Sequence, residues 1–321
     1  MEYRHLGRTG LHVSDICLGT MQFRWTTDDD NANAVLDAFF DAGGNFIDTA
    51  DVYSRWAPGL KGGEAETVIG AWLQRRGNRQ DVVLATKVRG RMWAGPNGEG
   101  LSRAHILRAV DESLRRLQTD YIDLYQTHAP DLGTPIEETL RALDDLIHQG
   151  KVRYAGCSNY TGYQLMEATL TARHAGLHEF VSLQPHYSLV ERETFEKHVL
   201  PVARQFGLGV IPYSPLGRGF LTGKYRRGAP PPDSLRLNSV QKLLTDRNFD
   251  LLDKVESLAV TRNNTPAQVA LGWLLTQPEI SAVIIGANTV AQLNDSLGAT
   301  GLRLAADEVA ALDALSSPVA A

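Results

Sequence analysis

Two apolar runs joined by a helical segment decide the fold class: Val82-Val-Leu-Ala-Thr-Lys87 and Ile122-Asp-Leu-Tyr-Gln-Thr-His128. Both runs have the length of a buried β-strand. The apolar side chains between them recur with the period of an α-helix, and they are Ile106, Leu107, Val110, Leu114 and Leu117. A strand, an amphipathic helix and a second strand make one unit of a parallel sheet.

The same alternation runs along most of the chain. Eight strands are expected, at residues 16–19, 45–48, 82–87, 122–128, 152–158, 180–184, 209–214 and 282–286. Eight such units with right-handed crossovers close naturally into a barrel, so we predict the α/β class and a (β/α)₈ TIM barrel. An open, doubly wound sheet would show the same periodicity.

Helix boundaries are signalled by capping residues. Thr134-Pro135 and Thr265-Pro266 each offer a hydroxyl at the N-cap and a proline in the first turn, and Glu137 completes a capping box with Thr134. Gly150 and Gly176 stand where helices are expected to end.

Two segments lie outside the repeat. Residues 3–6 and 11–13 flank Gly7-Arg-Thr-Gly10 and predict an N-terminal β-hairpin. Residues 218–249, which include three successive prolines, form a long insert after the seventh strand; loops of that length are functional lids or disordered. Because no linker or second core is evident, we expect residues 1–321 to form a single domain.

Composition narrows the classes of partner. The formal net charge is −5 and is spread along the 321 residues, which argues against nucleic acid or an anionic membrane. Cys17 and Cys157 lie in apolar runs and read as buried thiols of a reducing compartment. With neither a leader-like N-terminus nor an apolar run of transmembrane length, we expect a cytoplasmic protein.

Polar residues end most of the expected strands. Barrel enzymes place their working residues there, so these side chains are expected to share one mouth. They are Asp48, with Tyr53 five residues on, Lys87, His128, Ser158, Asn159, Gln184, Tyr213 and Ser214.

Asp48, Tyr53, Lys87 and His128 suit the reduction of a carbonyl. Such a reduction needs a proton for the developing alkoxide. A lysine beside a tyrosine favours the phenolate and lowers its pKa, Asp48 would hold Lys87 in place, and His128 would orient the carbonyl. Each residue alone has a simpler structural explanation, such as a loop cap or a solvated strand end. Their occurrence together at neighbouring strand ends favours the catalytic interpretation.

The sequence argues against a metal site and a glycosidase site, and it leaves the role of three tryptophans open. No His-x-His ends a strand, and Gly176 separates His174 from His178, so no metal site is expected. Asp123 begins its strand and should face the bottom of the barrel, which leaves Asp48 without the second carboxylate of a glycosidase. The tryptophans of three loops, Trp25, Trp56 and Trp93, either wall a substrate pocket or pack the loops.

Several segments resemble the aldo-keto reductases. They are Asp48-Thr-Ala-Asp-Val-Tyr53, Gly63-Glu-Ala-Glu-Thr-Val-Ile-Gly70, Gly150-Lys-Val-Arg-Tyr-Ala-Gly-Cys-Ser158-Asn159 and Ile211-Pro-Tyr-Ser-Pro-Leu-Gly217. The resemblance spans nearly the whole chain. The long insert and the Gly-rich segment after Tyr53 are more similar to the microbial sugar-, aryl-alcohol- and general aldehyde-reducing branches than to mammalian aldose reductase.

This resemblance implies an NADP(H)-dependent enzyme that reduces aldehydes or ketones, or that oxidises the matching alcohols or sugars in the reverse direction. Asp48, Tyr53, Lys87 and His128 would be its catalytic tetrad. Ser158, Asn159 and Gln184 would hydrogen-bond the carboxamide, while Tyr213, followed by Ser214, would stack on the nicotinamide. Gly19, Thr20 and Met21 would line the ribose.

The phosphate end is less typical of the family. No Gly-x-Gly-x-x-Gly follows an early strand, so a Rossmann-type site is not expected. Leu216, Gly217 and Gly219 could cradle a pyrophosphate, and the insert could deliver Lys224. At the start of the last barrel helix, Gly286, Asn288, Gln292 and Asp295 include no cation where the family often has one. We therefore expect NADP(H) with weak discrimination, and NAD(H) usable as well.

The alternative function is a cofactor-sensing subunit resembling the potassium-channel β-subunits. For the reductase, the expected substrate is a small carbonyl compound or sugar. The expected assembly is a monomer or a weak homo-oligomer.

Overall fold

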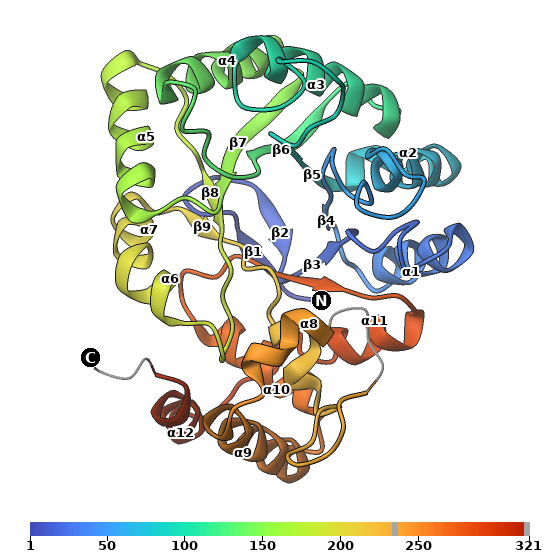
Figure 1. Cartoon of the computed structure of the whole chain (residues 1–321), viewed down its shortest axis with the longest axis vertical. Coiled ribbons are helices and arrows are strands. Elements are labelled where there is room, and N and C mark those ends of the chain that lie inside the picture. Colours follow the sequence, from blue (N-terminus) through green and yellow to red (C-terminus); the bar gives the residue numbers. More distant parts are fainter. Residues whose placement is uncertain (233–236, 318–321) are drawn as a thin grey trace.

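Eight parallel strands surrounded by helices form the centre of the protein, as the computed structural model shows (Figure 1). The structure describes residues 1–232 and 237–317. The strands are β3 (Ile16–Gly19), β4 (Phe46–Asp48), β5 (Val83–Val88), β6 (Ile122–Thr127), β7 (Val152–Ser158), β8 (Ser182–Gln184), β9 (Gly209–Val210) and β10 (Val283–Gly286), and they pair in the order β10-β3-β4-β5-β6-β7-β8-β9. The predicted (β/α)₈ TIM barrel is confirmed.

The sheet closes on itself between β9 and β10. No continuous ladder joins these strands in the described part of the chain. A single bridge between Val210 and Ile280 and three backbone hydrogen bonds connect the two sides instead. They run from Val210 N to Glu279 O at 3.0 Å, from Ser281 N to Val210 O at 2.9 Å and from Ile284 N to Pro212 O at 3.0 Å.

Helices cover the outside of the barrel, with α8 to α12 in the lower part of Figure 1. They are α1 (Asp29–Asp41), α2 (Glu64–Arg76), α3 (Arg103–Leu117), α4 (Ile136–His148), α5 (Gly162–Ala175), α6 (Glu193–His198), α7 (Leu200–Phe206), α8 (Leu237–Val240), α9 (Asp246–Arg262), α10 (Pro266–Thr276), α11 (Val290–Leu297) and α12 (Ala306–Ser316), with short 3₁₀ turns at η1 (Arg79–Asp81), η2 (Gly217–Thr222) and η3 (Gln241–Leu243).

The barrel interior is a small apolar core with the hairpin at its base. Strands β1 (Tyr3–His5) and β2 (His12–Ser14) pair antiparallel, as predicted. Leu6 follows β1 and packs, fully buried, with Phe46, Leu124 and Ile284 in this interior core. A separate and larger core fills the space between the strands and the helices.

Two details of the expected secondary structure are wrong. The seventh strand ends at Val210 rather than at residue 214. Ile211 N and Tyr213 N still donate across to Leu183 O and Pro185 O at 3.0 Å, but Pro185 has no N–H to donate in return, so the regular ladder stops. The Thr134 hydroxyl donates to Asp131 at 2.8 Å instead of capping α4, and no side chain caps that helix. The capping box of Thr265 with Gln268 and the left-handed C-cap at Gly176 are present.

The expected insert at residues 218–249 holds η2, α8, η3 and the start of α9, and its residues 233–236 lie outside the described residues.

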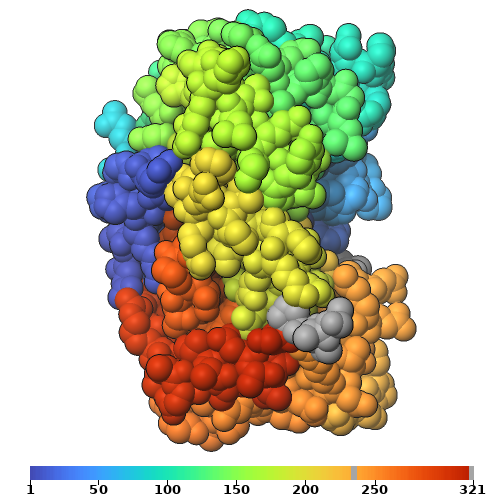
Figure 2. All heavy atoms as spheres, turned by 90° about the vertical axis from the view of Figure 1, so that its left-hand side faces the viewer, coloured from blue at the N-terminus to red at the C-terminus, as the bar shows by residue number. Residues whose placement is uncertain are grey.

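Figure 2 shows one side of the molecule, where the yellow segment around residue 200 lies between the green helices and the orange and red C-terminal part.

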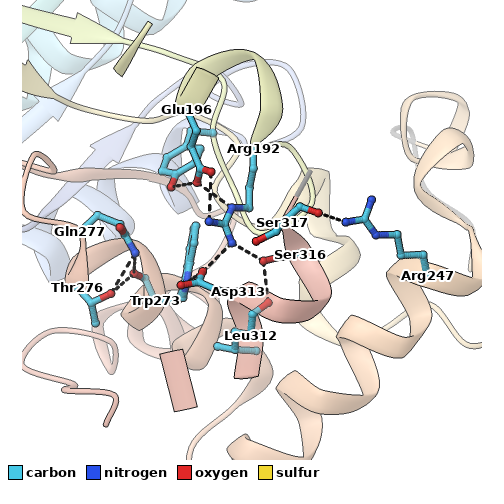
Figure 3. Close-up of polar contacts among 11 residues, drawn as sticks. Arg192, Glu196, Arg247, Trp273, Thr276, Gln277, Leu312, Asp313, Ser316 and Ser317 are labelled. Carbon is cyan, nitrogen blue, oxygen red and sulfur yellow. Dashed lines mark hydrogen bonds and ion pairs between the residues drawn. The ribbon is translucent and has the colours of Figure 1, made fainter. Parts of the chain in front are cut away.

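A polar cluster ties this side together (Figure 3). Arg192 pairs with Glu196 at 2.7 Å and with Asp313 of α12 at 2.6 Å. Asp313 also accepts from the Trp273 indole of α10 at 3.1 Å. Because the Arg192 side chain is only 10% exposed, this cluster locks α6, α10 and α12 to one another.

Candidate active site

The functional side chains continue the inward-facing rows of the barrel core. Side chains along a strand alternate between its two faces. Phe46 on β4 points into the interior core, so Asp48 two residues later does too. By the same alternation Val83 and Ala85 precede Lys87, and Leu124 precedes Gln126 and then His128. The predicted site residues therefore lie in the layer of inward-facing side chains at the carboxyl ends of the strands.

Lys87 joins the two acidic members of the predicted tetrad. Its Nζ donates to Asp48 Oδ2 at 2.5 Å and to Tyr53 Oη at 2.9 Å. A third hydrogen bond, 2.8 Å long, goes to the carbonyl of Thr49. The three donors of the ammonium are all used, and the side chain is fully buried. The Tyr53 hydroxyl is thus held at one fixed position.

The pKa of Tyr53 differs from the expectation. Burial raises the pKa of the phenol to about 12, and the nearby positive charge of Lys87 only partly offsets this. The expected net lowering is therefore wrong, because desolvation of the phenolate outweighs the attraction of the ammonium. Burial also acts on Lys87, but Asp48 and Tyr53 overcome it and raise the pKa of the ammonium. Tyr53 keeps its proton and Lys87 keeps its charge at neutral pH.

His128 sits beside Tyr53, with ring centroids 5.8 Å apart in an edge-to-face arrangement. Burial and the positive charges of Lys87 and Arg89 lower the pKa of its imidazole to about 3. The ring is neutral at physiological pH, so it can orient a substrate oxygen by one hydrogen bond without adding a charge.

Gln126 is a member of this site that our sequence analysis missed. Its Nε2 donates to Asp48 Oδ1 at 3.1 Å, and Gln184 Nε2 donates to the same oxygen at 2.9 Å. All three side chains are buried. The alternation that points His128 inward also points Gln126 inward, so the signal was present in the strand register.

The next strand ends carry a connected polar group. Ser158 Oγ donates to the Gln184 carbonyl at 2.8 Å, and Asn159 Nδ2 donates to the His128 carbonyl at 3.0 Å. Asn159 Oδ1 accepts from Tyr213 Oη at 2.9 Å. His186 stacks on the Tyr213 ring at 5.1 Å, with 12° between the planes, and so braces it from one side.

One cavity of about 790 Å³ collects most of the predicted residues. It runs from Asp48, Tyr53 and His128 past Tyr213 to Asn288 and Asp295. Its size is typical of a site for a cofactor and a small substrate. The predicted residues that do not line it are Thr20, Lys87, Gly217, Trp56 and Trp93. Thr20 instead supports the floor, since its hydroxyl donates to the Asp48 carbonyl at 3.1 Å.

Neutral amide side chains and one carboxylate line the far end of the cavity. Asn288 Oδ1 accepts from the Thr27 hydroxyl at 2.9 Å and from Thr26 at 3.1 Å, while Asn288 N donates to Gln292 Oε1 at 2.8 Å. Asp295 also lines this end and accepts from the Thr265 hydroxyl at 2.7 Å.

Two cations reach the cavity from the segment after β9. Lys224 lines it, and no carboxylate within the described ranges lies in ion-pair distance of Lys224. Arg218 lines it too, 3.6 Å from Glu191, and it is a residue our sequence analysis did not assign. Arg226 and Arg227 are engaged elsewhere, with Glu256 and with Asp246 and Asp250.

The three tryptophans separate into two groups. Trp25 and Trp56 meet edge-to-face at 5.5 Å, and Trp56 lies 6.2 Å from Tyr53, so an aromatic wall leads to the tyrosine. Trp93 lies apart from them. Its ring packs on His105 at 4.8 Å and under the Arg108 guanidinium at 4.0 Å.

Neither residues 1–232 nor 237–317 contain a helix long and apolar enough to cross a membrane.

Comparison with known proteins identifies the family of this chain. The sequence matches the Aldo/keto reductase family over residues 15–317.

Curated proteins that are similar to this chain span nearly its full length. It is 42% identical over 310 residues to the uncharacterized oxidoreductase YrpG of Bacillus subtilis, covering 95% of this chain and 92% of that protein. It is 38% identical to a probable voltage-gated potassium channel subunit beta of Oryza sativa, covering 93% of this chain and 91% of that protein. An aldo-keto reductase of Fusarium vanettenii is 35% identical, with 99% and 92% covered. The chain therefore belongs to the aldo/keto reductase family, whose members are oxidoreductases that use nicotinamide cofactors on small molecules.

Proposed function

We propose that this protein is an NADP(H)-dependent reductase of aldehydes or ketones, also able to oxidise the matching alcohols or sugars, with Tyr53 as its general acid. The observation that carries the proposal is the pair of hydrogen bonds from Lys87 Nζ, to Asp48 Oδ2 at 2.5 Å and to Tyr53 Oη at 2.9 Å. The pair lies at the inner end of a cavity that admits a cofactor and a substrate together.

The residues fit a nicotinamide at this end. Tyr213 offers a flat ring whose other face is occupied by His186, so a planar group would stack on the face toward the cavity. Ser158, Asn159 and Gln184 offer the mixture of donors and acceptors that a carboxamide needs. When bound, the reduced cofactor supplies the hydride.

The chain itself supplies the proton and the geometry. Tyr53 holds a proton on Oη, directed by the hydrogen bond from Lys87. His128 holds the carbonyl oxygen near that hydroxyl, and the phenol proton moves to the oxygen as its negative charge develops. The phenolate that remains is stabilised by the ammonium, which Asp48 keeps in place. In the oxidising direction Tyr53 accepts the proton.

Lys224 and Arg218 are the groups we propose for the cofactor phosphates, together with the backbone of Leu216 and Gly219. Gly219 adopts a left-handed conformation, φ +96°, and its missing side chain leaves space beside the Lys224 ammonium. The acidic Asp295 and the neutral Asn288 weaken any preference for a 2′-phosphate, so NADH is also expected to serve.

Steady-state turnover tests the proposal. The purified chain is mixed with NADPH and 4-nitrobenzaldehyde, and the absorbance of the reduced cofactor is followed, with Tyr53→Phe as the control. Many turnovers per active site in the wild type and few in the variant would support it. The absence of turnover across a panel of aldehydes, ketones and sugars would contradict it.

A cofactor-sensing subunit is the second candidate, favoured by the similarity to the rice protein named as a potassium channel subunit beta. Such a subunit would bind the cofactor without sustained turnover of a carbonyl substrate. The same assay separates the two functions. The cytoplasmic location, the single domain and the assembly state stay predictions.

A further inference from the structure

A second group of chemically capable side chains lies in the outer helical layer, outside the catalytic cavity. Asp144 and His148 stand one turn apart on α4, and His178 lies in the connection between α5 and β8 (Figure 1). The potential ligand atoms of the three side chains all lie within 4.8 Å of one another. The proposed reaction uses none of them.

The carboxylate is the fixed centre of this group. Asp144 Oδ1 lies 2.6 Å from His178 Nδ1, and Asp144 Oδ2 lies 3.2 Å from His148 Nδ1. The backbone N–H of His178 also donates to Asp144 Oδ1 at 2.9 Å. Burial opposes ionisation of Asp144, but the hydrogen bonds from His178 prevail and hold the pKa of the carboxyl below its ordinary value. The carboxylate is therefore charged and preoriented.

The two imidazoles remain accessible. Asp144 is 13% exposed, whereas the side chains of His148 and His178 are 69% and 50% exposed. Their rings meet edge-to-face with centroids 5.3 Å apart. An ion can thus approach from solvent. To bind it through Nδ1, His148 would exchange its 2.9 Å hydrogen bond with the Asp144 backbone carbonyl for the ion.

Two imidazoles and one carboxylate form a ligand set for a particular class of ion. Nitrogen and carboxylate ligands bind zinc at about 2.0–2.2 Å, which separates neighbouring ligand atoms of a tetrahedral site by roughly 3.3–3.5 Å. The two imidazoles lie 2.6 and 3.2 Å from different oxygens of the Asp144 carboxylate, and one ligand atom from each of the three residues lies within 4.8 Å of the others, so a rearrangement of side chains alone would bring them to a common ion. Calcium and magnesium prefer sites made of oxygen atoms alone.

We propose that Asp144, His148 and His178 form a surface site for one divalent transition-metal ion of the zinc type, with water completing its coordination. The ion would connect α4 to the segment that enters β8. The ion would take the place of the direct hydrogen bond between His178 Nδ1 and Asp144 Oδ1. Because the ligands come from two segments, bound metal also stabilises the folded state.

The hairpin provides a competing pair of histidines. His5 and His12 face one another across β1 and β2 with ring centroids 4.1 Å apart. Within the described residues, no acidic side chain completes a three-ligand group with them. His12→Ala therefore reports on any binding at this pair. His174→Ala, an exposed histidine on α5 outside the group, is the matched surface control.

The test is calorimetric titration of the full-length, untagged, chelator-treated protein with Zn²⁺, repeated with Co²⁺ to record its visible absorption. We expect one ion per chain at micromolar affinity or better. The affinity should fall at least about tenfold in His178→Ala and Asp144→Asn, a loss that even indirect partners of a metal produce. It should persist in His12→Ala and His174→Ala.

Thermal denaturation gives an independent readout. Zn²⁺ should raise the Tm of the wild type and of His174→Ala, but not that of His178→Ala, while carbonyl-reducing turnover stays the same in all three. The proposal is overturned by binding only at millimolar Zn²⁺, by unchanged affinity in both His178→Ala and Asp144→Asn, or by its loss in His12→Ala.

Discussion

The Tyr53 hydroxyl lies 2.9 Å from the Lys87 ammonium, and Lys87 is fully buried while Tyr53 borders the cavity. A substrate can therefore reach the phenol but not the amine. In the proposed reaction, the proton would therefore pass through Tyr53, and Lys87 would act only through its charge and its hydrogen bond. This arrangement leads to the first prediction.

Tyr53→Phe should lower kcat for aldehyde reduction by at least about 10²-fold, because the proton donor is lost while the ring remains. The dissociation constant of NADPH, measured by fluorescence, should change little. Lys87→Met should also lower kcat strongly. The double variant should be scarcely worse than either single one, since the two groups act as a unit. Additive losses would argue against the shared hydrogen bond.

The acid sensitivity of folding should depend on His128. Its pKa is about 3 in the folded protein, whereas a free histidine titrates near ~6.5. As pH falls below ~6.5, the unfolded chain takes up a proton that the folded chain refuses, so the free energy of unfolding decreases. The contribution at pH 5 relative to pH 8 is about 2 kcal/mol.

Urea denaturation at pH 5 and pH 8 measures this effect. In His128→Gln, the difference in unfolding free energy between the two pH values should shrink by about 2 kcal/mol relative to wild type. His174→Gln, which alters an exposed histidine, should leave the difference unchanged. Equal pH dependence in all three proteins would mean that His128 is charged in the folded state.

The pH profile of catalysis should be flat where histidines ordinarily titrate. With the pKa of Tyr53 near 12 and that of His128 near 3, neither group changes protonation between pH 5.5 and pH 8.5. Log kcat/KM for reduction should then be level across this range in a constant-ionic-strength buffer. An inflection near ~6.5 that disappears in His128→Gln would assign an ordinary pKa to that imidazole.

Trp25 and Trp56 should select for aromatic substrates. Removing either ring should raise KM for a bulky aromatic aldehyde by about 1 kcal/mol, roughly fivefold, because one edge-to-face or stacking partner is lost. Small aliphatic aldehydes should be affected less. Trp93→Ala is the matched control, since that ring packs on His105 and Arg108 instead. The wall has no selective role if all three variants treat both substrate classes alike.

Lys224 should carry much of any preference for NADPH over NADH. Lys224→Met should weaken NADPH more than NADH, and the difference should shrink at high salt, where charge–charge attraction is screened. Arg227→Met is the control, because its guanidinium is already paired with Asp246 and Asp250. Asn288→Arg should tighten NADPH by about 1–2 kcal/mol. A strong preference for NADPH that is insensitive to salt would place the 2′-phosphate elsewhere.

Much of the barrel could be predicted because each strand is a short, buried, apolar run. Residues 16–19 and 152–158 are found as strands with the predicted bounds, and the other strands differ mainly at their ends. The exception, β9, is short because Pro185 in the neighbouring segment has no N–H to donate, although Tyr213 N still donates to Pro185 O. Thr134 shows the limit of local signals: its capping sequence was correct, but Asp131 offered the hydroxyl a better partner.

The site could be predicted where its residues end strands, and less well where they sit in loops. Asp48, Lys87 and Gln184 meet because strand register brings them to one layer, while Gln126 was missed only because it lies one inward step below His128. The separation of Trp93 from Trp25 and Trp56 depends on loop conformations that no periodicity encodes. The net pKa of Tyr53 likewise depends on burial, which a linear sequence does not measure.

The closure of the barrel between β9 and β10 affects where a ligand enters and where backbone amides exchange with solvent. Ladders join neighbouring strands on seven sides of the ring, whereas an isolated bridge and three backbone hydrogen bonds join the eighth, so we expect the barrel to open first along that side. Residues on both flanks of this seam, among them Tyr213, Leu216, Gly286 and Asp295, border the long cavity. Amide protons there should exchange faster than those of β5 to β7. A long ligand would then enter and leave by parting the seam, while the opposite wall, which carries Lys87, stays still.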